Sequence, residues 1–329
     1  MGLSRRLFLQ GGVALAAAPA AGTRAAEPAR IKHVIYCTLD SSDPKQDELG
    51  RKDLSRLLAP HGLAEGRDFD VAFVRAAQPV HETWDDLLRE PARAVVARRP
   101  DIIIVHMVWL TQMRAATSEI PIIFESALDL EEHAGVRDQR RPGTNVTGVI
   151  SPFFEGIGKR IELLKEMRPS AKRAAVVHDD AGPALNRGCA SAIAAAGKRL
   201  GLEHAQIVLP PGGHPQLVKM VRDRRIDLAD FLMDPSPPQL AELAAAGVAT
   251  SIASSARVVR EGGLLSYGPV DGEQVFAGIL ARVLRGEHPS TIPAQQPGKY
   301  RLFLNMRTAR ALGIEVPPAI QLRAVVVAK

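Results

Sequence analysis

The sequence of 329 residues contains only two cysteines, and it has no run of five or six basic residues. So few cysteines exclude a small scaffold that is held together by disulfides. Hydrophobic residues make up 46% of the chain and charged residues 24%, which is ordinary for globular proteins and excludes bulk disorder. A chain of this length exceeds what one core accommodates, so we expect two lobes, each with its own core.

Local signatures of catalysis and nucleotide binding are absent as well. The sequence has no G-x-x-x-x-G-K-[ST] phosphate loop, no G-x-S-x-G elbow and no H-E-x-x-H motif. Gly156-Ile157-Gly158 lacks the third glycine of a dinucleotide fingerprint, and the nine histidines have no metal-ligand spacing. We therefore expect no enzyme activity, no cofactor and no metal site. The alternative is an enzyme whose acid–base pair comes from distant residues such as Asp179 or Asp234.

The positive charge of the chain is concentrated at its start. Lysine and arginine number 42 against 36 acidic residues, a net charge of +6. Arg5, Arg6 and Arg24 lie in the first 26 residues, where no acid occurs, so the rest of the chain is nearly balanced. Since the remaining charges are interspersed, we expect no nucleic-acid partner.

Residues 1–26 have the features of a bacterial export signal. The pair Arg5-Arg6 precedes an apolar, alanine-rich stretch and small residues suited to cleavage, which is the twin-arginine form. The apolar stretch is too short to span a bilayer. Cys37 is the first cysteine, so no lipid attachment site follows the leader. We expect an exported, soluble periplasmic protein, in which Cys37 and Cys189 are buried thiols rather than a disulfide.

From Ile31 onward, apolar strands alternate with amphipathic helices, and the pattern occurs twice. Arg98-Arg99-Pro100-Asp101, before one strand, is echoed by Arg224-Arg225-Ile226-Asp227 before another. This order predicts an α/β fold with two doubly wound parallel-sheet lobes. The final segment is too short for a third domain, so the chain must cross between the lobes several times. The lobes are expected to comprise residues 27–127 with 262–292, and residues 128–261 with 293–329.

Ligands of parallel sheets bind at the carboxyl ends of the strands. Polar and aromatic residues that follow or end the expected strands are therefore the candidate ligand contacts: Ser41, Ser42, Trp109, Ser126, Asp179, Asp234 and Tyr267. Each has a plainer alternative. The serines and aspartates also suit turns and helix caps, Trp109 also suits the core, and Tyr267 also suits packing at a hinge.

Several segments, in order along the chain, resemble one family. They are Gly62–Arg67, Ala116–Phe124, Arg141–Val149 with its Asn145-Val146-Thr147-Gly148 segment, Glu261–Pro269 and Asn305–Gly313. These segments are similar to the substrate-binding proteins of bacterial ABC transporters, in the family that includes tryptophan- and tyrosine-binding members. One departure is the bulky loop His106–Leu110, which stands where the family usually has small residues.

The resemblance implies the type I periplasmic-binding fold, two lobes joined by a three-crossing hinge. It also implies a monomeric receptor that closes on a small molecule, an amino acid or related carboxylate, and delivers it to an importer. The permease and the ATPase of that importer would be separate chains. A sensor that presents its closed form to a membrane signalling receptor is the alternative function.

Overall fold

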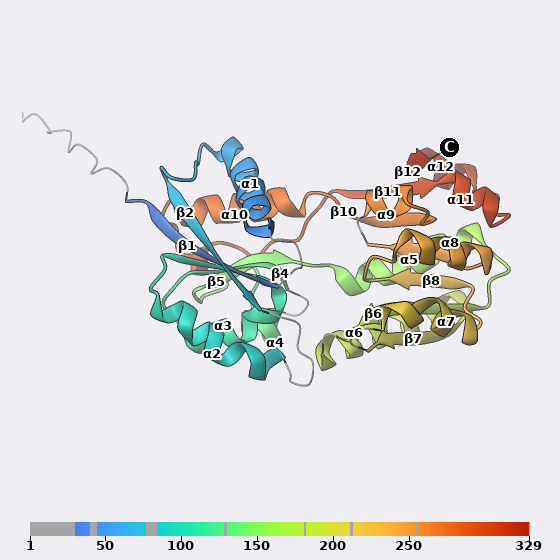
Figure 1. Ribbon diagram of the computed structural model, residues 1–329, viewed down its shortest axis with the longest axis horizontal. Coiled ribbons are helices and arrows are strands. Elements are labelled where there is room, and N and C mark those ends of the chain that lie inside the picture. The colour runs from blue at the N-terminus through green and yellow to red at the C-terminus, as the bar shows by residue number, and fades with distance from the viewer. Residues whose placement is uncertain are drawn as a thin grey trace, which may run out of the picture. The chain divides into compact units, whose positions relative to one another are not determined.

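The computed structural model describes residues 30–39, 45–76, 84–127, 130–180, 182–210, 213–253 and 255–328 (Figure 1). These residues form two sheets, one with the strand order β2-β1-β3-β4-β5 and one with the order β12-β11-β10-β9-β8-β6-β7. Helices cover both faces of each sheet, which confirms the predicted α/β fold with two parallel-sheet lobes. The leader, residues 1–26, lies outside the described residues.

The five-stranded sheet is parallel throughout. Its strands are β1 (Lys32–Leu39), β2 (Phe69–Ala76), β3 (Ile102–Val105), β4 (Ile122–Ala127) and β5 (Val146–Ile150). Figure 1 shows α1 (Gln46–Leu58) and α10 (Gly272–Leu284) on one face, and α2 (Trp84–Ala97) and α3 (Leu110–Ala116) on the other. Every residue of β3 is buried, since a central parallel strand with both faces covered is apolar on both sides.

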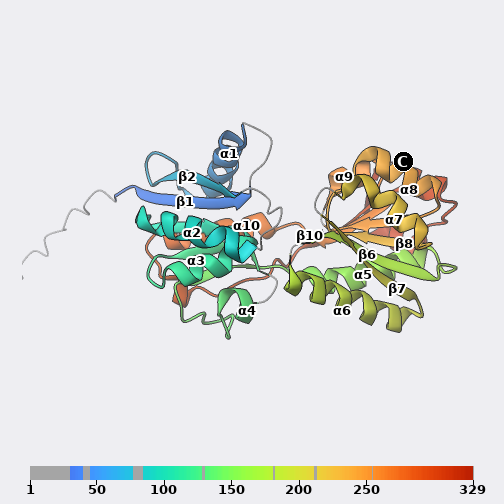
Figure 2. The same ribbon diagram turned by 60° about the horizontal axis from the view of Figure 1, so that its bottom comes forward.

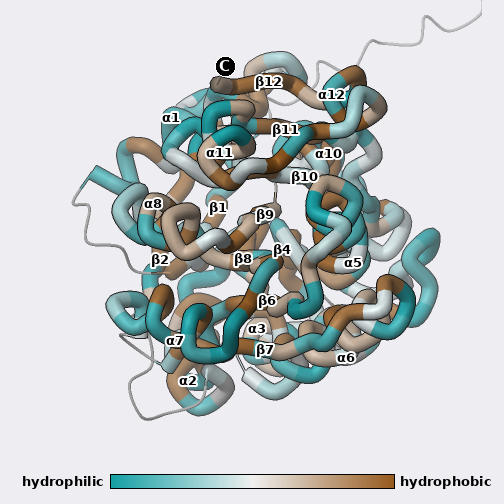
Figure 3. Tube along the Cα trace, turned by 90° about the vertical axis from the view of Figure 1, so that its right-hand side faces the viewer, coloured by the Kyte–Doolittle hydropathy of each residue, from teal (hydrophilic) through white to brown (hydrophobic). Residues whose placement is uncertain are grey.

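The seven-stranded sheet is parallel except between β10 and β11. Its strands are β6 (Arg173–Asp179), β7 (Glu203–Leu209), β8 (Leu228–Phe231), β9 (Ala249–Ile252), β10 (Leu265–Pro269), β11 (Tyr300–Asn305) and β12 (Ala324–Ala328). Figure 3 shows the hydrophobic character of β11 and β12, the latter at the edge of the sheet.

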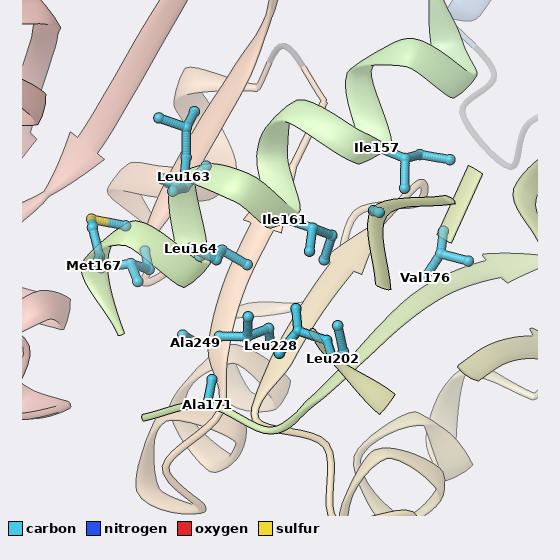
Figure 4. Close-up of a cluster of buried hydrophobic side chains, with 14 of the residues drawn as sticks. Ile157, Ile161, Leu163, Leu164, Met167, Ala171, Val176, Leu202, Leu228 and Ala249 are labelled. Atoms are coloured by element: carbon cyan, nitrogen blue, oxygen red, sulfur yellow. The ribbon is translucent and has the colours of Figure 1, made fainter. Parts of the chain in front are cut away.

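The helices of the seven-stranded sheet also form two layers (Figure 2). One layer consists of α5 (Phe153–Met167), α6 (Pro183–Leu200), α11 (Met306–Ala311) and α12 (Pro318–Arg323). The other consists of α7 (Leu217–Asp223), α8 (Pro237–Ala245) and α9 (Ala256–Arg260). Figure 4 shows Ile157, Ile161 and Leu164 of α5 directed at Val176, Leu228 and Ala249 of the sheet, so these residues form the core stripe of this helix.

The strand pairings differ from the expected lobe boundaries at two strands. β5, expected in the second lobe, pairs with β4 in the five-stranded sheet. β10, expected to return to the first lobe, pairs with β9 and β11 in the seven-stranded sheet. The physical reason is that an apolar run predicts a strand but does not show which sheet the strand joins. The chain therefore crosses after each of these strands rather than before it.

Three crossings connect the sheets, at residues 151–152, 270–271 and 296–299. They are tied together by backbone hydrogen bonds: Ile150 N donates to Gln295 O at 2.8 Å, and Val270 N donates to Lys299 O at 2.8 Å. The Asp271 carboxylate also accepts from the N–H groups of Gly298 (3.3 Å) and Lys299 (3.0 Å). The three-crossing hinge implied by the family resemblance is therefore present.

The repeated Arg-Arg-x-Asp segments have the same structure in both sheets. Arg99 and Arg225 both adopt the left-handed conformation, with φ of 49° and 52°. Asp101 then accepts from the N–H of His33 at the start of β1 (2.8 Å), and Asp227 accepts from that of Arg173 at the start of β6 (2.9 Å). Each aspartate thus fastens an incoming strand to the first strand of its own sheet.

Cys37 and Cys189 are buried and unpaired, as expected, and burial raises the pKa of each thiol to about 12. Their burial leaves both thiols protonated at neutral pH. Among the described residues, no helix combines the length and the apolar character needed to cross a bilayer.

A buried ion pair lies inside the seven-stranded sheet. Arg160 of α5 donates two hydrogen bonds to Asp230 of β8, through Nε (2.6 Å) and Nη2 (2.9 Å), and both side chains are at most 2% exposed. Ser251 of β9 donates to the same carboxylate at 2.7 Å. Arg160 Nη1 donates to the carbonyl of Tyr267 in β10 (3.4 Å), so Arg160 is bonded directly to two strands.

Asp230→Ala is expected to lower the free energy of unfolding by about 3–5 kcal/mol, because it leaves the Arg160 charge buried without a partner. Replacing both partners, Arg160→Met with Asp230→Leu, should recover much of that loss, since no charge is then left buried. Urea unfolding of the three proteins measures both effects. Equal destabilisation of the single and double variants would contradict this account of the pair.

Candidate functional site

The carboxyl ends of β1, β3 and β4 carry three polar side chains on the face that α1 and α10 cover. They are Tyr36, His106 and Glu125, and each lies two residues beyond a buried residue of that face: Val34, Ile104 and Ile123. Because alternate residues of an extended strand share a face, all three point to the same side of the sheet. The Tyr36 hydroxyl donates a hydrogen bond to Glu125 Oε1.

Glu125 is a partly buried carboxyl group. Burial raises its pKa, the negative charge of Glu273 raises it further, and the hydrogen bond from Tyr36 offsets part of this. Burial and the neighbouring Glu125 charge in turn raise the pKa of the Tyr36 hydroxyl, which keeps it a donor. The Tyr36 ring is stacked on Phe73 of β2, with 5.4 Å between the ring centroids.

His106 occupies the place next to Glu125 in the sheet. Val105 of β3 is paired with Phe124 of β4, so the next residues, His106 and Glu125, are neighbours at the end of the two strands. Burial lowers the pKa of His106, which favours the neutral imidazole. Its Nδ1 is buried and has no hydrogen-bond partner among the described residues.

The other predicted contacts of this sheet take different positions. Trp109, in the 3-10 turn Met107–Trp109, is fully buried, and its Nε1 donates to the carbonyl of Thr38 at 3.0 Å. It therefore packs in the core instead of presenting its ring to a ligand, because the turn after β3 directs it inward. Ser126 follows Glu125 in the irregular end of β4 and is partly buried. Ser41 and Ser42 lie outside the described residues.

In the seven-stranded sheet, the predicted acids have basic partners at the strand ends. Asp179, at the end of β6, is half-exposed and bonds to Nε2 of His214 at 3.0 Å. The His214 carbonyl accepts from Gln239 at 2.6 Å, and Gln239 forms a capping box with Ser236 after β8. Asp234 pairs with Arg257 of α9. The loops that carry Asp179 and Asp234 are therefore joined by a chain of hydrogen bonds.

Tyr267 lies in β10, next to the second crossing. Its ring stacks on Tyr300 of β11 at 5.5 Å between centroids and packs against the core shown in Figure 4. Tyr300 is 39% exposed and ends the third crossing, so the two rings span the strands that enter and leave the hinge. This position of Tyr267 fits the hinge-packing alternative, and Tyr300 is the more exposed ring of the pair.

The sequence analysis did not select Glu125 or Tyr36 as site residues, and it noted His106 only as the first residue of a bulky loop. One signal could have identified Glu125: it follows the buried Ile123 by two residues, so it had to share the face of Ile123. The covering helix α10 comes about 150 residues later, and the sequence pattern did not show which face it covers.

The two sheets and the three crossings between them have the type I periplasmic-binding fold. Structures with this fold include a conserved domain protein from Vibrio cholerae (21% identity, TM-score 0.75), which covers 90% of this chain and 99% of its own. An ABC domain in complex with L-Trp from Streptococcus pneumonia (19%, TM-score 0.74) covers the same shares. A ligand-free, open substrate binding protein with adhesive properties from Clostridium difficile (19%, TM-score 0.64) covers 91% and 100%.

The family model of ABC transporter substrate binding proteins matches residues 77–209. No curated protein matches the chain. The family match and the shared fold confirm the resemblance to ABC transporter substrate-binding proteins that the sequence segments indicated.

Glu125→Gln is expected to raise the melting temperature at pH 8 by roughly 2–4 °C and to change it little at pH 4. The folded-state pKa of Glu125 lies above its ordinary value of 4.5. The contribution of Glu125 to stability is therefore largest below pH 4.5. It falls as the pH rises toward and through the folded-state pKa, because ionisation costs more in the folded protein than in the unfolded one. The glutamine variant lacks this loss. Calorimetry at pH 8 and pH 4 measures the melting temperatures, with the exposed Glu203→Gln as the control variant. An equal difference in melting temperature between Glu125→Gln and the unmodified protein at both pH values would contradict a raised pKa of Glu125.

Proposed function

We propose that this protein is the periplasmic solute-binding component of an ABC import system, which closes its two lobes on a small molecule. The observation that carries the proposal is the family match over residues 77–209, on a fold whose two sheets are joined by three short crossings. In such a fold, contacts made with both lobes favour the closed state, so that the solute itself drives closure.

The crossings of this chain suit such a motion. Each consists of two to four residues, and their cross-links are backbone hydrogen bonds and the bonds of Asp271. Such short, mutually bonded segments bend together, since a hinge needs only a few residues to absorb the change in backbone angles. The packed sheets on either side then move as rigid bodies, because their cores are closely packed.

The proposed solute is an amino acid or a related carboxylate, which the L-Trp bound to the similar pneumococcal domain supports. The proposed contacts are Ser41, Ser42 and Ser126 from the first lobe and Asp179, Asp234 and Tyr267 from the second. Trp109 would act indirectly, by fixing the loop after β3 through its bond to Thr38. The permease and the ATPase would be separate chains, and the leader would direct the protein to the periplasm.

A thermal-shift screen against amino acids, other carboxylates, nucleosides and sugars tests the proposal. A solute at about 100 times its dissociation constant adds roughly 2.7 kcal/mol of stability, which raises the melting temperature of a chain of this size by roughly 4 °C. We expect one chemical class to give such shifts. The protein is to be refolded from denaturant first, so that no solute remains bound. No shift with any member would contradict a receptor for these solutes.

A further inference from the structure

In the part of the chain that the structure describes, the Glu125 carboxyl group has no cationic partner. Among the described residues its one hydrogen-bond partner is Tyr36, which uses only Oε1. Burial and Glu273 raise its pKa, and no basic side chain contributes to lowering it. A partly buried carboxyl group in this state is costly, and proteins keep such groups mainly where a ligand or a reaction needs them.

Three arginines of α1 and β2 are paired with other acids. Arg56 of α1 donates to Asp53 (3.4 Å) and to Glu273 (3.1 Å). The guanidinium groups of Arg51 and Arg75 lie over the Phe73 ring, each 5.8 Å from its centroid. They pair with two other carboxylates, Glu65 and Asp47. The arginines at this end of α1 and β2 therefore leave Glu125 uncompensated.

A second acceptor lies beside Glu125. His106 follows β3 at the position level with Glu125, and neighbouring strands are about 4.8 Å apart. Its neutral ring offers one nitrogen as an acceptor, and Nδ1 has no partner among the described residues. The Glu125 carboxyl group, the His106 imidazole and the Tyr36 phenol thus lie at the ends of neighbouring strands, on the side where the Tyr36 and Phe73 rings stack.

An ammonium or guanidinium group fits this arrangement. It carries several N–H donors and a positive charge, so it would donate to Glu125 and to the unpartnered nitrogen of His106 and would stabilise the ionised form of Glu125. We propose that Glu125, His106 and Tyr36 form the subsite that receives a positively charged amino or guanidino group of the solute. This inference rests on the proposed function, and it adds that solutes without such a group are excluded.

Probes with and without a cationic group test the inference on the unmodified protein. L-Tryptophan, L-phenylalanine and L-leucine are compared with the corresponding α-hydroxy acids, and agmatine and putrescine with neutral sugars. We expect thermal shifts only with probes that carry a cation, and a loss of at least 100-fold in affinity when the amino group is replaced by hydroxyl. Equal binding of an amino acid and its hydroxy acid, or binding of sugars alone, would overturn the subsite while leaving a solute receptor in place.

Substitution of the subsite gives an independent result. Glu125→Gln keeps the size of the side chain and is expected to weaken binding of the best cationic probe at least tenfold by calorimetric titration. His106→Ala is expected to weaken it less. Glu203→Gln, which removes an exposed carboxylate beside Arg173, should leave the affinity unchanged. Unchanged affinity in Glu125→Gln would overturn the subsite, and no binding by any probe to the unmodified protein would overturn the proposed function as well.

Discussion

The buried Arg160, ion-paired with Asp230, links the two elements of the seven-stranded sheet that adjoin the first and second crossings. Arg160 lies in α5, the first element after the first crossing, and it bonds to β8 and to the carbonyl of Tyr267 in β10, the last strand before the second crossing. The first and second crossings are thus adjacent to elements, α5 and β10, that are bonded to the same guanidinium group. The geometry of a bidentate pair is rigid, so any bending falls on the few residues outside it.

The two strand-end sites differ in their charge balance. In the seven-stranded sheet Asp179 is hydrogen-bonded to His214, and Asp234 is ion-paired with Arg257. In the five-stranded sheet the hydrogen-bond partner of Glu125 among the described residues is the Tyr36 hydroxyl group. A solute that enters between such sites would find its charge partner on the first sheet and exchangeable polar contacts on the second. The choice of solute by the proposed receptor would then depend on the carboxyl ends of β3 and β4, where the bulky loop His106–Leu110 departs from the family pattern.

The alternating apolar pattern and the repeated segment predicted an α/β fold with two similar lobes, because both follow from short patterns. The Asp101 and Asp227 contacts arise from one repeated motif. The sheet to which β5 and β10 belong could not be predicted, since pairing depends on distant edges. The site was harder still: the role of Glu125 depends on which face α10 covers, and the burial of Trp109 depends on a turn that no local pattern marks.

The central claim is that two lobes close on a solute about the three crossings. Small-angle X-ray scattering of the purified protein, with and without a saturating cationic amino acid that binds in the thermal screen, tests it most directly. The account predicts a smaller radius of gyration with the solute and no change with the matching hydroxy acid. An unchanged radius of gyration with the solute fully bound would contradict closure of the lobes.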